Sequence, residues 1–370
     1  MGRSLGDRGI LIAIIGPSAE VVSGSLLRPI NIYYSLKGFK SIRASYIPTR
    51  KILDLLSQLR RIQHTDIIIM SGVNPWTSAS IAVLGKILRK KVVADFHGFA
   101  WLEVNMTDAT GFLIKVLLLV SEKISYKLSQ YVVAASEWLA NVLTYYFGKR
   151  KGVIVVENAV SCIFEEVAHK LMESYDLSRL RKYVCGKVLH RDDCLNKLWF
   201  IAPLPPVFKS NILAYEELLK LRGLLNENMV VIVTGIKRAN VFNVSSSIIP
   251  IGYVGYVDYV ALLLSSDGVI LPYPSNAICG GVRNKVLEAG FFKKTVISTK
   301  VGMMHCKTSP LVHYIPISTV LGKKVYCVKR WALAAQKLHE IILQQHTFSS
   351  FKQSFITFIR FILMKRRGVP

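Results

Sequence analysis

Short runs of apolar residues alternate along this chain with segments whose apolar positions recur at helical spacing. The first run, Ile10 to Ile15, contains no polar residue and ends at Gly16-Pro17, which is typical of a central strand in a parallel sheet. A glycine-containing loop and a helical pattern from Leu26 to Leu36 follow it. This order predicts the opening unit of a doubly wound α/β domain. Gly24 in the loop either lies near a bound ligand or only starts the helix.

The same alternation continues to Val156. Further strands are predicted, each as a short apolar run, at Asp66 to Ser71, Val92 to Asp95, Tyr131 to Ala134 and Val153 to Val156. Strands that alternate with helices form a Rossmann-like domain, whose ligands bind at the carboxyl ends of the strands. His97 follows such an end. Its imidazole would be able to donate a hydrogen bond to a sugar or to stabilise a leaving group, although a lone histidine is often only a packed or solvent-facing residue.

A charged stretch without a strand pattern separates this half of the chain from a second alternating half. The second half carries predicted strands at Leu198 to Ala202, Met229 to Thr234 (ended by Gly235), Ile249 to Gly252, Val269 to Leu271 and Thr295 to Thr299. We therefore predict an α/β protein with two Rossmann-like doubly wound domains that face a cleft. The predicted boundaries are 1–165 for the first domain, 166–197 for a linker, 198–345 for the second domain and 346–370 for a C-terminal helix.

The C-terminal helix has a distinct pattern. Phe351, Phe355, Phe358 and Ile362 share one helical stripe, and the segment ends in Lys365-Arg366-Arg367. Such an amphipathic, basic helix is able to lie in a membrane interface or to pack back on the first domain, and the pattern leaves both open. The apolar segment from about Gly111 to Ser129 raises the same alternatives, and there a core helix between two strands is favoured.

Composition narrows the class of partner. The 370 residues are 51% hydrophobic and carry a formal net charge of +25, which predicts an affinity for polyanions such as anionic lipid or nucleotide substrates. A chain that is both basic and apolar favours a membrane surface, and the absence of a zinc-finger spacing or an RNA-recognition signature argues against nucleic acid. No run of about 18 uncharged apolar residues predicts a transmembrane helix, and no signal peptide is recognised.

The cysteines give no sign of a metal site. All six are scattered, none stands in a Cys-x2-Cys pair, and the spacing of His190 between Cys185 and Cys194 fits no standard zinc pattern. We therefore predict no metal and a reducing, cytoplasmic compartment.

The stretch from Asp267 to Gly302 holds the candidate chemistry. A predicted strand leads through a loop to Gly280-Gly281 and then to a helix, whose N-terminus favours anions. Lys285 and Glu288 share one stripe of that helix, with Asn284 beside them. A diphosphate for Lys285 and a pair of sugar hydroxyls for Glu288 would suit this arrangement. The alternative is a surface ion pair at i,i+3, with the glycines serving only a turn.

The ordered motifs of both halves resemble those of retaining nucleotide-sugar glycosyltransferases of the GT-B fold, of the family-4 type. The segment IGYVGYVDYVALLLSSDGVILPYPS is similar to the family's F-x-G-x-V … L … A-D-x-x-x-x-P-S, and RNKVLEAGFFKKTVISTKVG to its E-A-x-A-x-G-x-P-V-I-A-T-x-x-G. Val92 to Gly98 and Glu157 to Val160 resemble its first-domain motifs. The family often has two glutamates eight apart. Here the first position holds Gly280, and the family's diphosphate-binding Arg is missing near Pro203.

The resemblance implies roles for individual residues. Glu288 would hold the ribose hydroxyls, Lys285 the diphosphate, and His97 the donor sugar or the β-phosphate, so His97 and Glu288 are the catalytic candidates. The other implied donor-binding positions are Gly24, Lys209, Gly235, Gly280, Gly281, Val282 and Asn284. No cofactor or metal is expected beyond the substrate, a sugar on UDP or GDP.

The resemblance thus predicts transfer of a sugar, with retention, to a lipid-linked or glycan acceptor. Charge, hydropathy and the C-terminal helix together lead us to expect the enzyme peripherally on the cytoplasmic face of the cell membrane. Because Gly280 replaces a glutamate, a non-catalytic subunit that binds a nucleotide-sugar or a partner is the alternative.

Overall fold

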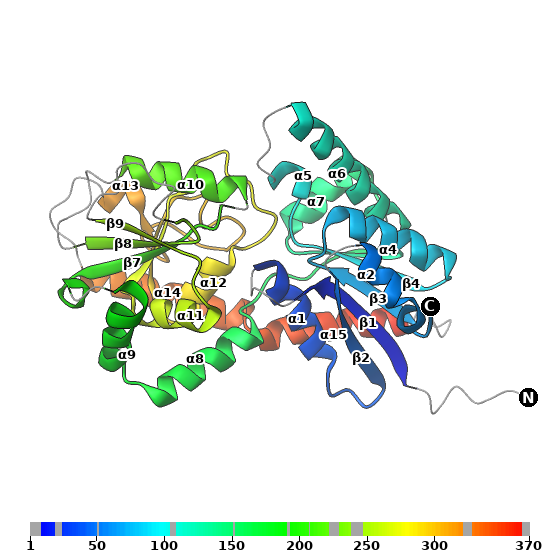
Figure 1. Ribbon diagram of the computed structural model, residues 1–370, viewed down its shortest axis with the longest axis horizontal. Coiled ribbons are helices and arrows are strands. Elements are labelled where there is room, and N and C mark those ends of the chain that lie inside the picture. The colour runs from blue at the N-terminus through cyan, green and yellow to red at the C-terminus, as the bar shows by residue number, and fades with distance from the viewer. Residues whose placement is uncertain are drawn as a thin grey trace, which may run out of the picture. The chain divides into compact units, whose positions relative to one another are not determined.

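The computed structural model describes residues 9–18, 24–49, 52–103, 109–150, 152–190, 193–206, 208–221, 229–237, 247–320 and 328–364. The chain divides into two compact units (Figure 1). Unit 1 comprises Met1–Leu102, Met106–Ser161 and Phe348–Pro370, and unit 2 comprises Glu103–Asn105 and Cys162–Thr347. Residues 166–197, which the sequence predicts as a linker, thus fall within unit 2.

The described strands of unit 1 form one parallel sheet in the order β2-β1-β3-β4-β5-β6. Their bounds are β1 Ile10–Pro17, β2 Ile42–Thr49, β3 Ile67–Ser71, β4 Lys91–Phe96, β5 Tyr131–Ala134 and β6 Val153–Val155. The chain moves from β1 to β2 and then returns to the other side of β1 with β3, which makes a doubly wound topology. The edge strand β2 is absent from the sequence prediction, because its residues are mostly half-buried and form no pure apolar run.

Helices cover both faces of this sheet, which explains why its central strands are apolar throughout. The bounds are α1 Gly24–Leu36, α2 Ile52–Ser57, α3 Leu59–Gln63, α4 Pro75–Ile87, α5 Ala100–Glu103, α6 Ala109–Leu128, α7 Glu137–Phe147 and α15 Phe348–Met364. Successive β1 residues point into different cores: Ile12 and Ile14 into one, Ala13 and Ile15 into the other. Both cores exclude water almost completely.

The C-terminal helix α15 belongs to the core of unit 1. Its stripe of Phe351, Phe355, Phe358 and Ile362 is buried in the cluster that contains Ile12, Ile14 and Val93. Burial in this cluster removes the stripe from any membrane interface. The basic residues Lys365, Arg366 and Arg367 lie outside the described residues.

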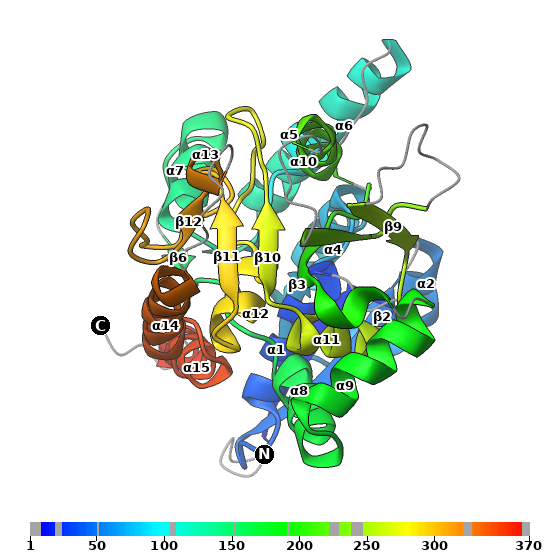
Figure 2. The ribbon, with the colours of Figure 1, turned by 90° about the vertical axis from the view of Figure 1, so that its left-hand side faces the viewer.

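Unit 2 has a second parallel sheet, whose described strands run in the order β12-β11-β10-β7-β8-β9 (Figure 2). Their bounds are β7 Leu198–Pro203, β8 Met229–Thr234, β9 Ile248–Gly252, β10 Gly268–Leu271, β11 Thr295–Ser298 and β12 Ile315–Pro316. The chain winds from β7 through β8 to β9 and then restarts on the other side of β7 with β10. The predicted fold class of two parallel-sheet, Rossmann-like α/β domains is confirmed.

The helical elements of unit 2 pack around this sheet. Their bounds are α8 Cys162–Ser174, α9 Leu177–Tyr183, the π-helical turn η1 Val184–Leu189, the 3-10 turn η2 Asp193–Asn196, α10 Lys209–Lys220, α11 Tyr256–Ser265, α12 Asn284–Phe291, α13 Ile317–Val320 and α14 Val328–Gln345. Both α8 and α9 contact α11, so the predicted linker is part of a packed layer.

Cys185 is disulfide-bonded, whereas Cys162, Cys279 and Cys306 are thiols. In the part of the chain that the structure describes, no helix combines the length and the apolarity that crossing a bilayer requires.

A buried ion pair connects the carboxyl ends of the strands in unit 1. Arg28 of α1 donates from Nε and Nη2 to both carboxylate oxygens of Asp95, at 2.8–3.0 Å. Ser71 at the end of β3 donates to Asp95 at 2.6 Å, and Nη1 of Arg28 donates to Asn158 at 2.9 Å. Its Nη2 also reaches the Val156 carbonyl at 2.8 Å. One guanidinium thus connects α1, β4 and the exit of β6.

Burial alone would raise the pKa of Asp95, but the Arg28 guanidinium and the nearby His97 outweigh it and hold that pKa well below its usual range. Asp95 is therefore ionised at every physiological pH, and Arg28 has its counter-ion.

Replacing Asp95→Ala should lower the free energy of unfolding by about 3–5 kcal/mol, because it leaves the Arg28 charge buried without a counter-ion. Urea denaturation measures this. The double variant Arg28→Met with Asp95→Leu, which removes both charges, should recover most of the loss. An Asp95→Ala protein as stable as the wild type would show that the pair does not hold the sheet ends together.

Candidate functional site

The loop from β10 to α12 brings the predicted donor-binding residues of unit 2 into one place. Strand β10 ends at Leu271, the loop passes Tyr273 and Gly280-Gly281, and α12 begins at Asn284. The backbone of this loop is held by short contacts, since His305 Nε2 lies 2.7 Å from the Cys279 carbonyl and Cys279 Sγ donates to the Gly281 carbonyl at 3.1 Å. Gly280, Gly281 and Val282 are buried, and Asn284 is half-buried as the first residue of α12.

Lys285 points its ammonium into a polar cluster. Its Nζ donates to Asn211 Oδ1 at 2.9 Å and to the Tyr273 hydroxyl at 2.5 Å. The Tyr273 hydroxyl in turn donates to the same Asn211 oxygen at 2.7 Å, and Asn211 Nδ2 donates to the Pro205 carbonyl at 2.8 Å. Burial, followed by the positive charge of Arg283, lowers the pKa of Lys285 well below its ordinary value. The Lys285 side chain thus lies where burial disfavours its charged form.

This cluster lies where the strand order of unit 2 reverses. Asn211 is on α10, which follows β7, and Tyr273 follows β10, the neighbour of β7 on the other side. The Asn211–Tyr273 hydrogen bond therefore joins α10 to the loop after β10, at the topological switch point of the sheet. In open α/β sheets, ligands bind in the crevice at that point.

Arg283 adds a second cation to the cluster. Its guanidinium carbon lies 3.6 Å from the centroid of the buried Tyr273 ring, and Nη2 donates to the Ala277 carbonyl at 3.1 Å. Its Nε is buried and has no hydrogen-bond partner. A buried donor without a partner costs free energy, and an incoming acceptor would satisfy it.

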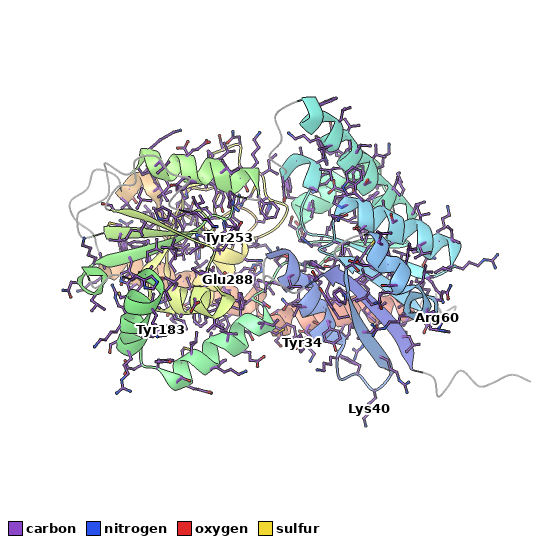
Figure 3. All side chains as sticks on the ribbon, viewed as in Figure 1. Tyr34, Lys40, Arg60, Tyr183, Tyr253 and Glu288 are labelled. Atoms are coloured by element: carbon purple, nitrogen blue, oxygen red, sulfur yellow. The ribbon has the colours of Figure 1, made fainter. Side chains whose placement is uncertain are left out.

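Glu288, labelled in Figure 3, is buried one turn along α12, with 4% of its surface exposed. Its Oε2 accepts a hydrogen bond from the Tyr259 hydroxyl of α11 at 2.6 Å. Burial raises the pKa of Glu288 to about 7, although Tyr259 and Lys285 act in the opposite direction. The surface ion-pair interpretation is wrong, because Glu288 is buried, Lys285 is half-buried, and the two side chains bond to different partners.

Lys209 and Gly235 flank the cluster. Lys209 is the first residue of α10, two positions before Asn211. Gly235 follows β8 with a φ of +92°, and a Cβ there would lie 2.6 Å from the Pro205 Cα. Only glycine fits at this position, which keeps the loop of Pro205 and Asn211 close to the end of β8.

The other two predicted site residues belong to unit 1. Gly24 is the first residue of α1, four positions before Arg28. His97 follows β4, and its Nδ1 lies 3.7 Å from Asp95 Oδ2, which is too far for a hydrogen bond. The His97 side chain is 24% exposed, and its Nδ1 is buried.

Sequence reasoning missed Asn211, Tyr259, Tyr273, Arg283 and Arg28. Arg283 and Tyr273 stand in the stretch that carries the candidate chemistry, and their residue types offered a signal. Asn211 and Tyr259 stand on other helices, and nothing local marks them. No cluster of three metal-ligating side chains occurs among the described residues.

The raised pKa of Glu288 predicts a pH dependence of stability. An ordinary glutamate ionises near 4.5 and folded Glu288 at about 7, so between these values the unfolded chain releases a proton that the folded chain keeps. Wild-type stability should therefore fall by up to about 3 kcal/mol as the pH rises through this window, and level off above it. A Glu288→Gln variant should lack this decline in urea denaturation. Parallel pH profiles for the two proteins would contradict the assignment.

Comparison with known proteins identifies solved structures that have a similar fold. No protein-family model and no curated protein matches the chain. Among solved structures, Anabaena HepE in complex with UDP-glucose matches with a TM-score of 0.68 and 13% identity, covering 95% of this chain and 100% of that chain. Sucrose-phosphate synthase of Thermosynechococcus elongatus matches with a TM-score of 0.67 and 10% identity, covering 96% and 100%.

UDP-GlcNAc 2-epimerase of Neisseria meningitidis, bound to UDP-GlcNAc, matches with a TM-score of 0.52 and 12% identity, covering 95% of this chain and 99% of that chain. At such low identity these matches establish the fold alone. The chain has the GT-B fold.

Proposed function

We propose that this protein is a glycosyltransferase of the retaining, family-4 type. It would transfer a sugar from a UDP- or GDP-linked donor to a lipid-linked or glycan acceptor, at the cytoplasmic face of a membrane. The observation that carries the proposal is the cluster at the switch point of unit 2, where Lys285 and Arg283 lie one turn from a buried Glu288. Anabaena HepE, which shares the fold, binds UDP-glucose.

A diphosphate suits the two cations. Burial penalises the charged form of Lys285, and an anion beside Nζ would offset that penalty by supplying a counter-charge. The Nε of Arg283 would gain its acceptor from the same group. Arg283 thereby offers a cation where the family's usual Arg, near Pro203, is absent. Where water is excluded, fixed positive charges would strongly stabilise the negative charge of a leaving diphosphate.

A ribose suits Glu288. Tyr259 uses one acceptor position of the carboxylate, and a carboxylate has about four. The remaining oxygen would accept from the two ribose hydroxyls, and these bonds would favour the ionised form of Glu288, whose pKa burial raises to about 7.

The transfer itself would use the donor as its own base. The bond between the anomeric carbon and the β-phosphate oxygen breaks, and the acceptor hydroxyl oxygen bonds to that carbon on the same face. The hydroxyl proton passes to the leaving diphosphate. Lys285 and Arg283 stabilise the diphosphate charge, and His97 contacts the donor sugar or β-phosphate. No metal or cofactor is needed in this scheme.

A non-catalytic, donor-binding subunit is the second candidate. It is favoured by Gly280, which stands where the family often carries its first glutamate. Both candidates bind the donor, but only the enzyme releases UDP or GDP in the presence of an acceptor.

Nucleotide binding tests the site. Thermal-shift titration with UDP, GDP and their sugars should show stabilisation of the wild type by one of them. Lys285→Ala and Glu288→Ala should each weaken that binding about tenfold to a hundredfold, because each removes a charged hydrogen-bonding group. Lys300→Ala, which removes an exposed cation of the same unit, is the matched control. Unchanged affinity in both site variants would overturn the assignment.

A further inference from the structure

Helix α6 exposes a continuous apolar stripe to solvent. Phe112 and Leu113 are 67% and 63% exposed, and Val116, Leu117 and Val120 continue the stripe along the same side of the helix. In both Figure 1 and Figure 2, one end of α6 reaches past α4 and α7. Monomeric proteins seldom leave so many large apolar side chains together in water, and such patches usually mark an interaction surface.

The opposite side of α6 packs against the rest of unit 1, so the apolar stripe is exposed while the helix is folded in place. Leu118, Ser125 and Tyr126 are buried on its inner side, and the Tyr126 hydroxyl donates to the Gly148 carbonyl at 3.0 Å. Glu122 Oε1 accepts from the Ala100 backbone at 2.8 Å. The helix therefore has a packed polar and apolar side and an unpartnered apolar side.

Positive charge borders the stripe. Lys123 and Lys127 are exposed and extend the same side of α6 beyond Val120. Helix α4, which packs against α6, exposes Lys86 between Val83 and Ile87. The sequences of α4 and α6 contain a single carboxylate, that of Glu122, and it is buried. The surface formed by these exposed α4 and α6 residues, called here the α4–α6 surface, is thus apolar and cationic.

We propose that the α4–α6 surface docks onto an anionic lipid bilayer, with Phe112, Leu113 and Leu117 inserted at the headgroup boundary and the lysines against anionic headgroups. An amphipathic helix with large apolar residues and flanking lysines binds membranes both by burying its apolar side chains and by electrostatic attraction to anionic headgroups. A second copy of this chain fits less well, because a self-complementary contact would bring like charges together. This inference rests on the membrane association in the proposed function, and it names the surface that would contact the membrane. This surface replaces the α15 stripe, which is buried.

Vesicle co-sedimentation tests the proposal on the full chain. The wild type should bind phosphatidylcholine vesicles that contain phosphatidylglycerol, and bind pure phosphatidylcholine vesicles more weakly. The triple variant Phe112→Ser, Leu113→Gln, Leu117→Gln should bind about tenfold or more weakly, because it removes the inserted apolar area. Lys123→Gln with Lys127→Gln should weaken binding to the anionic vesicles about tenfold and leave the weak binding to neutral vesicles unchanged. Leu333→Gln with Leu343→Gln, two exposed leucines of α14, is the matched control and should bind as the wild type does.

Three results would overturn the proposal: no vesicle binding by the wild type, equal binding by the triple variant, or a wild-type dimer in light scattering that the triple variant converts to a monomer. Nucleotide-induced thermal shifts of the same variants keep the two proposals apart. The triple variant should lose vesicle binding and keep its nucleotide-induced shift, which would show that α6 binds the membrane independently of the donor site. If the wild type binds vesicles but shows no nucleotide-induced shift, the proposed donor site is wrong and the membrane proposal stands.

Discussion

The ion pair of Arg28 and Asp95 is the constraint on which the arrangement at the carboxyl end of the unit 1 sheet depends. Two charges removed from water are tolerated only when they are well hydrogen-bonded. Here Ser71 donates to Asp95, and Asn158 and the Val156 carbonyl accept from Arg28. That requirement draws α1, β3, β4 and the exit of β6 together at one edge of the sheet. His97 directly follows β4 at this end of the sheet, two residues after Asp95.

Unit 2 balances its charges differently. Lys285 has a lowered pKa and Glu288 a raised one, because burial disfavours the charged form of each. The neutral polar groups around them (Asn211, Tyr273 and Tyr259) hold their geometry without supplying a counter-charge. The Arg28 guanidinium has a carboxylate bonded directly to it, whereas the hydrogen bonds of Lys285 go to the neutral groups of Asn211 and Tyr273. This difference in charge balance is why we place the donor's diphosphate there.

The sequence predicted what depends on local pattern. Pure apolar runs such as Ile10 to Ile15 revealed the central strands, because those strands are buried on both faces. The half-buried edge strand β2 has no such run and was missed. Local patterns could not predict contacts between residues far apart in the chain. Arg28 and Asp95 are 67 positions apart, and Lys285 and Asn211 are 74 apart. The stripes of α15 and α6 look alike in sequence, and only the packed structure shows that one is buried and the other exposed.

A crystal structure of the protein with UDP would test the central claim most directly. The account predicts a diphosphate oxygen within about 3 Å of Lys285 Nζ, a second near Arg283 Nε, and the ribose hydroxyls against Glu288. A UDP bound elsewhere, with Lys285 still bonded only to Asn211 and Tyr273, would contradict it.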